Sequence, residues 1–244
     1  MFFDGLSRVE VFFALFSVFM GAWVQSITGF GLAIVCVPFL LFIDPVLAPV
    51  PVILAAWVQP GMMLFQYYRH IDFPAIALAI TGRIPGTLVA LYLLLFLSAD
   101  RLSIVIGFLI LFAVSLSFSG RTFVYSRKNI FFASVLSGFM GTASGIGGPP
   151  VALVLRHQEG NRIRGFLALY FFLGSMISII GLAMVGKIHT REISLAMLFI
   201  PVIFLGTKFG SAFVRYREIK WLPLAILSLC FFAGLSVIIR YLFF

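Results

Sequence analysis

Charge, cysteine and histidine are all scarce in this chain. Only 10% of its 244 residues are charged, and there are two cysteines and three histidines. Cys36 and Cys230 lie inside apolar stretches, which excludes a disulfide framework or a cysteine-based metal site. His70, His157 and His189 fall in predicted loops, so no base is available for a buried serine nucleophile. We therefore expect no catalytic residue, no metal and no cofactor.

What the chain does contain is apolar sequence. It is 62% hydrophobic with a mean hydropathy of +1.17, which is typical of an integral membrane protein whose main surroundings are the lipid bilayer. A bilayer core of about 30 Å needs about 20 helical residues per crossing. We predict an all-α polytopic fold with eight apolar segments, at about 9–43, 45–68, 72–97, 101–119, 129–155, 163–186, 192–214 and 221–244.

The formal net charge of +9 does not indicate a nucleic-acid partner. The basic residues occupy short loops between apolar segments, which is the usual topology bias of membrane proteins, and no basic domain is present to bind nucleic acid.

Glycine clusters interrupt the first and the fifth apolar runs. Gly29-Phe30-Gly31 breaks the first run, and Gly145-Ile146-Gly147-Gly148-Pro149-Pro150 breaks the fifth. Irregular backbone at membrane depth survives only where it is buried in protein or lines a cavity. One break in each half of the chain is the pattern of a transporter site built by two repeats.

The two halves of the chain also align around these breaks. Gly29 and Gly31 match Gly145 and Gly147, Thr28 matches Ser144, and Pro85-Gly86-Thr87 matches Leu205-Gly206-Thr207. We predict two membrane repeats, 1–120 and 121–244.

Loop charges favour an inverted arrangement of these repeats. If the broken runs cross fully, the halves are parallel and the loop cations divide eight against seven. If each broken run is a helical hairpin, the halves are inverted and the cations divide ten against five. The ten, on the predicted cytoplasmic side, are Arg69, Arg121, Arg127, Lys128, Arg156, Arg162, Arg164, Arg215, Arg217 and Lys220. The positive-inside rule favours the inverted form with both termini outside, and the hairpin tips then meet near the midplane.

At these residues the chain resembles the sulfite exporter TauE/SafE family. The resemblance rests on Gln25-Ser26-Ile27-Thr28-Gly29-Phe30-Gly31 with Pro38, on Gly145-Ile146-Gly147-Gly148-Pro149, and on the order of the apolar runs. It implies a multi-pass carrier in a bacterial or archaeal inner membrane. The implied substrates are small anions such as sulfite and organosulfonates.

Two cations lie inside predicted membrane segments. Arg83 lies about 15 Å from the start of its run at 1.5 Å per residue, and a guanidinium fork suits an oxyanion. Thr87 is one turn further, on the same face. The alternative is that Arg83 binds backbone carbonyls freed near Pro85. Lys208 lies about 10 Å from the cytoplasmic edge and is either a substrate contact or a cation that reaches the interface.

The hairpin tips supply the other candidate groups. A half-helix is expected to begin after Gly31 and after Gly148, with Pro149 in its first turn, and helix N-termini attract anions. Thr28 and Ser144 are expected to cap these starts or to donate to the anion. The alternative for the glycines is close helix packing. The full set of candidate substrate-binding residues is Gln25, Thr28, Gly29, Phe30, Gly31, Arg83, Thr87, Ser144, Gly145, Gly147, Gly148, Pro149, Thr207 and Lys208.

None of the eight acidic residues falls in the middle of an apolar run. Proton-coupled pumps usually hold an acidic residue there. The lack of such a residue favours anion export that is driven by the membrane potential. We expect this export to proceed by alternating access at a midplane site. An anion channel, an importer of a sulfur oxyanion and a scaffold without transport are the alternatives. The sequence leaves the oligomeric state open.

Overall fold

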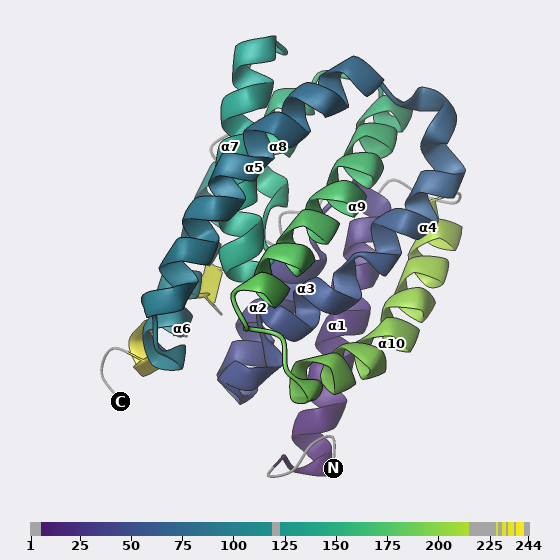
Figure 1. Cartoon of the computed structure of the whole chain (residues 1–244). Helices are drawn as coiled ribbons and strands as arrows, with labels where there is room; N and C mark the ends of the chain where they lie inside the picture. The colour runs from purple at the N-terminus through teal and green to yellow at the C-terminus, as the bar shows by residue number, and fades with distance from the viewer. Residues whose placement is uncertain are drawn as a thin grey trace.

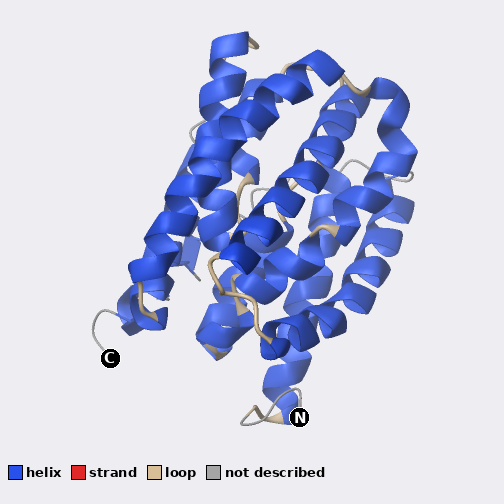
Figure 2. Cartoon of the chain, in the orientation of Figure 1, coloured by secondary structure: helices blue, strands red, loops and turns tan. Residues whose placement is uncertain are grey.

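The computed structural model describes residues 6–118 and 123–214, and in the last segment residues 228, 231–232, 234–236 and 238–241. These residues form helices and loops with no strand (Figure 2). In the first half the helices are α1 (Arg8–Thr28), α2 (Leu32–Ile43), α3 (Val50–Ala56), α4 (Val58–Tyr67), α5 (Phe73–Phe96) and α6 (Ala99–Phe118). In the second half they are α7 (Arg127–Ser144), α8 (Gly148–Leu155), α9 (Gly160–Met184) and α10 (Thr190–Val214). Short 3₁₀ turns cover Pro45–Leu47 and Tyr68–His70.

The two glycine breaks have nearly the same backbone geometry. Gly29 ends α1 with φ 88° and ψ −12°, and Gly145 ends α7 with φ 80° and ψ −9°. Each glycine N–H donates to the carbonyl four residues earlier, at Gln25 and Gly141. Only glycine adopts this left-handed conformation without strain, so the sequence itself fixes where both helices stop.

Beyond each break the chain turns back along the helix that it has just left. Gly21 of α1 packs on the backbone of Leu32, and the start of α1 shares a groove with the end of α2 at Glu10 and Ile43. In the same way, the Ser137 hydroxyl of α7 donates to the Gly147 carbonyl at 2.5 Å. Helices α1–α2 and α7–α8 are therefore antiparallel hairpins, and Figure 1 shows α1 and α7 entering from opposite ends of the molecule.

Glycine pairs bring each hairpin against a helix from the other half of the chain. Gly82 and Gly86 of α5 lie against the backbone of α7, at the carbonyls of residues 131 and 135. Gly206 and Gly210 of α10 lie against the backbone of α1, at the carbonyls of residues 19 and 23. Small residues spaced four apart allow such close approach of membrane helices. The packing is reciprocal, since each half supplies a hairpin to a glycine-faced helix of the other.

A polar cluster joins the starts of α5, α7 and α9 at one end of the molecule. Arg162 donates to the Asp72 carboxylate at 2.8 Å, and the Tyr125 hydroxyl donates to it at 3.3 Å. Burial raises the pKa of Asp72, but the hydrogen bonds from Arg162, the Ala75 N–H and Tyr125 bring its pKa below the usual value. At the opposite end, Arg240 donates to the Phe42 carbonyl beside the end of α2.

The outer surface fits a lipid environment and confirms the predicted all-α membrane class. In the described part of the chain, five helical stretches are long and apolar enough to cross a membrane, including α1, α5, α9 and most of α10. Large side chains such as Phe65 and Phe132 are exposed on the outside, at 85% and 68%. The predicted run at 45–68 is one candidate span, bent into α3 and α4. The predicted run at 221–244 lies mostly outside the described residues.

Candidate functional site

Arg83 is buried in the interior of the helix bundle. It is 3% exposed on α5, where α7 and α9 pack against that helix. Its Nη1 is 3.5 Å from the Ser137 hydroxyl, and its guanidinium carbon lies 5.1 Å from the centre of the Tyr170 ring. Its Nε has no hydrogen-bond partner. This Nε is enclosed by α9, beside Gly174.

Glycines on the neighbouring helices make room for this guanidinium. A Cβ on Gly174 of α9 would lie 2.2 Å from Nε of Arg83, and one on Gly141 of α7 would lie 3.0 Å from Nη2. Gly138 packs on the Arg83 backbone carbonyl. A side chain at Gly174 would therefore occupy the space that the guanidinium fills.

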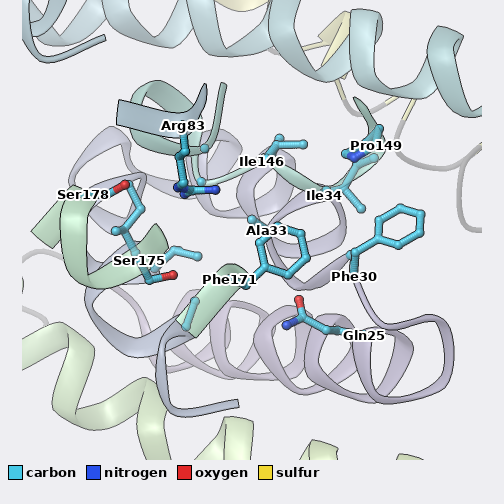
Figure 3. A pocket seen from close by; sticks show the side chains of 18 residues that line it. Gln25, Phe30, Ala33, Ile34, Arg83, Ile146, Pro149, Phe171, Ser175 and Ser178 are labelled. Atoms are coloured by element: carbon cyan, nitrogen blue, oxygen red, sulfur yellow. The ribbon is translucent and has the colours of Figure 1, made fainter. Parts of the chain in front are cut away.

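The guanidinium faces a small cavity of about 60 Å³, enough for a few water molecules or one small oxyanion. Figure 3 shows the Arg83 side chain pointing into it, with Ser175 and Ser178 of α9 beside it and Phe30 across from it. The remaining walls come from Gln25, Gly31, Ala33, Ile34, Val52, Ile53, Ala56, Gly141, Gly145, Ile146, Gly147, Gly148, Pro149 and Phe171. The cavity therefore lies where both glycine breaks and α5 come together.

The two breaks are in direct contact at this cavity. Gly148 packs on the Phe30 ring and would place a Cβ 2.7 Å from it, and Gly145 packs on the Ala33 methyl. Of the candidates from the breaks, Gln25, Phe30 and Gly31 line the cavity from the first hairpin. Gly145, Gly147, Gly148 and Pro149 line it from the second hairpin. Gly29 lies further away, against Leu167 and Arg164 of α9.

The N-termini of α2 and α8 offer different numbers of free backbone N–H donors. The Leu32 N–H at the start of α2 donates to the Gln25 side chain at 2.9 Å, so the next two amides, of Ala33 and Ile34, are the donors that no intrahelical bond uses. Helix α8 begins Gly148-Pro149-Pro150, and prolines carry no N–H. Helix α8 therefore offers fewer free N–H donors than α2, because two of its first three residues are prolines.

Thr28 and Ser144 close the breaks and do not cap the helix starts. The Ser144 hydroxyl donates to the Met140 carbonyl at 2.7 Å, and the Thr28 hydroxyl lies within hydrogen-bonding distance of the Phe30 carbonyl and, at 3.1 Å, of the Val24 carbonyl. Each also accepts from the N–H two residues later, of Phe30 and Ile146. Neither α2 nor α8 has a side-chain cap. The expected capping role is therefore wrong, and both residues hold the turn at the break.

The remaining three candidates lie away from the cavity. Thr87 is buried and accepts a 3.2 Å hydrogen bond from the Thr142 hydroxyl, which in turn bonds Ser178. Thr207 donates to the carbonyl of residue 203 in its own helix. Lys208 is exposed on the outer face of α10, with Nζ 5.3 Å from the centre of the Phe204 ring.

Sequence reasoning missed the serines around the guanidinium. Ser137, Ser175 and Ser178 come from α7 and α9, and none is near a glycine break in the sequence. Small polar residues are common in membrane helices, so their type alone carries little signal. A usable signal was Gly174 beside Ser175, because a glycine in a helix interior indicates close approach of another group.

This arrangement is suited to binding a small anion. The buried Arg83 guanidinium offers charge-assisted hydrogen bonds, and the Ser175 hydroxyl and the α2 amides offer further donors, whereas the Ser178 hydroxyl donates to the Gly174 carbonyl at 3.0 Å. Among the described residues that line the cavity there is no carboxylate, and the described part of the chain holds no cluster of three or more metal-ligating side chains.

Comparison with known proteins identifies the same family of membrane transporters that the sequence resembles. The family model for the sulfite exporter TauE/SafE matches residues 13–237. A protein of Cupriavidus necator named "Probable sulfite/organosulfonate exporter TauE" is 26% identical over 79% of this chain and 80% of its own length. No solved structure gives a significant match. The chain therefore belongs to the sulfite exporter TauE/SafE family of membrane transporters.

Proposed function

We propose that this protein exports a small sulfur-containing anion, sulfite or an organosulfonate, across a bacterial or archaeal inner membrane by alternating access. The substrate class follows from family membership and from the name of the C. necator relative. The observation that carries the proposal is Arg83, a buried cation whose side chain lines a cavity between two broken helices. A cation inside a membrane protein is costly and generally serves function.

The proposed architecture is two inverted repeats, 1–120 and 121–244, with eight apolar segments in total. The supporting observations are the matching break geometry at Gly29 and Gly145 and the antiparallel hairpins that enter from opposite ends. The reciprocal packing of α5 on α7 and of α10 on α1 is what a two-fold relation between repeats would produce. Rocking of one repeat against the other would expose the cavity to each side in turn.

The proposed direction is outward. A negative-inside potential drives each negative charge outward by about 2.3 kcal/mol per 100 mV, so an exporter of anions needs no coupling ion. The cavity holds no described carboxylate to serve as a proton carrier. The end that carries Asp72, Tyr125 and Arg162 is proposed to be cytoplasmic, because the larger share of loop cations flanks it.

Sulfite efflux from proteoliposomes tests this proposal. The wild type should show saturable efflux that accelerates with a potential negative inside the vesicles. Arg83→Ala should remove it while the protein stays folded, and Arg83→Lys should restore little of it, because an ammonium lacks the planar fork. Near-normal efflux by folded Arg83→Ala protein would overturn the proposed role of Arg83.

An anion channel is the second candidate, with the same breaks acting as a filter. Efflux that does not saturate with sulfite and that passes many ions per opening would favour the channel. Saturable exchange stimulated by sulfite on the far side would favour the carrier.

A further inference from the structure

Arg164, near the start of α9, is bonded to the end of α1. Its Nη2 donates to the Ile27 carbonyl at 3.2 Å, and its Nη1 donates to the Tyr67 hydroxyl of α4 at 3.4 Å. Its guanidinium carbon is 5.7 Å from the centre of the Tyr67 ring. The last turn of α1 contains no basic residue of its own. Arg164 therefore supplies, from the other half of the chain, a cation that favours the C-terminus of α1 and pairs one of its last carbonyls.

The contacts along α9 place the first break between the cavity and one end of the molecule. Near the start of α9, Leu167 packs on Gly29, and Arg164 lies beside the same glycine. Two to three turns further along the helix, Ser175 and Ser178 line the cavity. The start of α9 belongs to the end that is proposed to be cytoplasmic. The first break therefore lies between the cavity and the cytoplasm.

Phe30 belongs both to this break and to the cavity wall (Figure 3). Its ring packs on Gly148 at the start of the second hairpin, and on an apolar cluster that includes Phe166 and Leu167 of α9. The ring is only partly buried. Movement of the first break away from α9 would therefore take Phe30 out of the cavity wall and open the cavity toward the cytoplasm.

The bonds of Arg164 join helices that pack in different groups. One group is formed by α5 with α7 and α9, and α1 packs closely on α10. Arg164 joins α9 to α1, whereas the neighbouring Arg162 joins α9 to Asp72, the N-cap of α5, within the first group. Motion of α1 relative to α9 would break the bond of Arg164 and leave the bond of Arg162 intact.

We propose that Arg164 is a gating residue, which holds the first break closed over the cavity on the cytoplasmic side. In the form that is open to the cytoplasm, its bond to the Ile27 carbonyl is broken and Phe30 has left the cavity wall. The inference rests on the proposed function, and it names the contact that controls access to the same site. Removing a contact that only the closed form makes shifts the population toward the open form.

Thiol labelling of a cysteine in the cavity wall tests this proposal on the full-length protein. Ser175→Cys provides the thiol, and the same chains without this substitution give the background from Cys36 and Cys230. An impermeant maleimide is added to inside-out or to right-side-out membrane vesicles, so that each side is measured separately. We expect Arg164→Ala to speed labelling from the cytoplasmic side at least tenfold, and to leave labelling from the outer side no faster. Tenfold corresponds to about 1.4 kcal/mol, which is close to the worth of one hydrogen bond from a charged group.

A second variant and a matched control make the result specific. Phe30→Ala removes the side chain from the wall and keeps Arg164, so it should also speed labelling from the cytoplasmic side. Arg162→Ala removes an arginine two residues away that binds Asp72 and not the break, so it should leave the labelling rate unchanged.

Three outcomes would overturn the proposal. Unchanged labelling in folded Arg164→Ala or Phe30→Ala protein would show that the break does not control access from the cytoplasm. Equal acceleration in Arg162→Ala and Arg164→Ala would show a general loosening of that end of the molecule. Acceleration from the outer side alone would place the gate on the wrong side. Labelling needs no substrate, so these outcomes leave the export function standing, whereas absence of sulfite efflux from the wild type would overturn the export function.

Discussion

Substitution of Gly174 by alanine tests whether the orientation of the Arg83 guanidinium governs anion binding. The added methyl group would lie 2.2 Å from Nε and 2.5 Å from Cζ of Arg83. Both distances are far below van der Waals contact, so the guanidinium must move. Because the obstructing atoms belong to the end of a side chain, the backbone of α5 and α9 can stay in place. We therefore expect a folded protein with a displaced guanidinium.

The size of the effect follows from the contacts that the guanidinium loses. Forcing a methyl group into a packed interior costs about 1–3 kcal/mol of stability. A hydrogen bond from a charged group to the anion is worth about 1.5–3 kcal/mol. At 1.4 kcal/mol per tenfold change in affinity, loss of one such bond weakens sulfite binding by about ten- to a hundredfold.

Two other glycine substitutions provide the controls, with thermal melting and calorimetric titration of sulfite as the assays. In Gly160→Ala, on the same helix, the added Cβ meets nothing within 4 Å, so stability and binding should stay unchanged. In Gly86→Ala, the Cβ would lie 1.9 Å from the Val135 carbonyl oxygen, a backbone atom that cannot move aside without separating α5 from α7. That variant should lose folding, which separates a packing defect from a binding defect. A folded Gly174→Ala protein with wild-type sulfite affinity would show that the position of the guanidinium does not govern anion binding.

Further predictions concern the first break, the charged cluster and the topology. Gln25→Leu leaves the buried Leu32 N–H without its acceptor and should cost about 1–3 kcal/mol in thermal melts; an unchanged melting temperature would contradict this. The pKa of Asp72 is lowered, so its stabilisation is present above the ordinary carboxyl pKa of about 4 and is lost as the pH falls through the lowered value. Asp72→Asn should remove that acid-dependent part of the melting curve, and parallel wild-type and variant curves would contradict this. In intact cells, an impermeant thiol reagent should label His189→Cys and not Val124→Cys, and labelling of both would contradict the proposed topology.

The two breaks were predictable from the sequence because their cause is local. A left-handed residue at the end of a helix favours glycine, and Gly29 and Gly145 both adopt that conformation. Arg83 was predictable for a similar reason, since a guanidinium in the middle of an apolar run is costly unless buried beside a partner or a ligand. The smaller number of free N–H donors at the start of α8 was also predictable from the sequence, because Pro149 and Pro150 both lack an N–H.

The faces of the helices were harder to predict, because they depend on helix rotation. Lys208, like Arg83, is a cation inside an apolar run of the sequence, yet its side chain faces outward. Gly206 and Gly210 pack on α1, and a residue two positions from Gly206 is rotated by about 200° to the opposite side. The serines of α7 and α9 reach Arg83 only through the packing of three helices from both halves of the chain. No local pattern encodes that packing.

Equilibrium binding of radiolabelled sulfite to the purified protein tests whether Arg83 anchors the transported anion. We expect the wild type to bind one sulfite per chain. We expect Arg83→Gln to lose that binding, with a melting temperature in the absence of ligand close to that of the wild type. Stoichiometric sulfite binding by folded Arg83→Gln protein would instead place the anion site elsewhere in the chain.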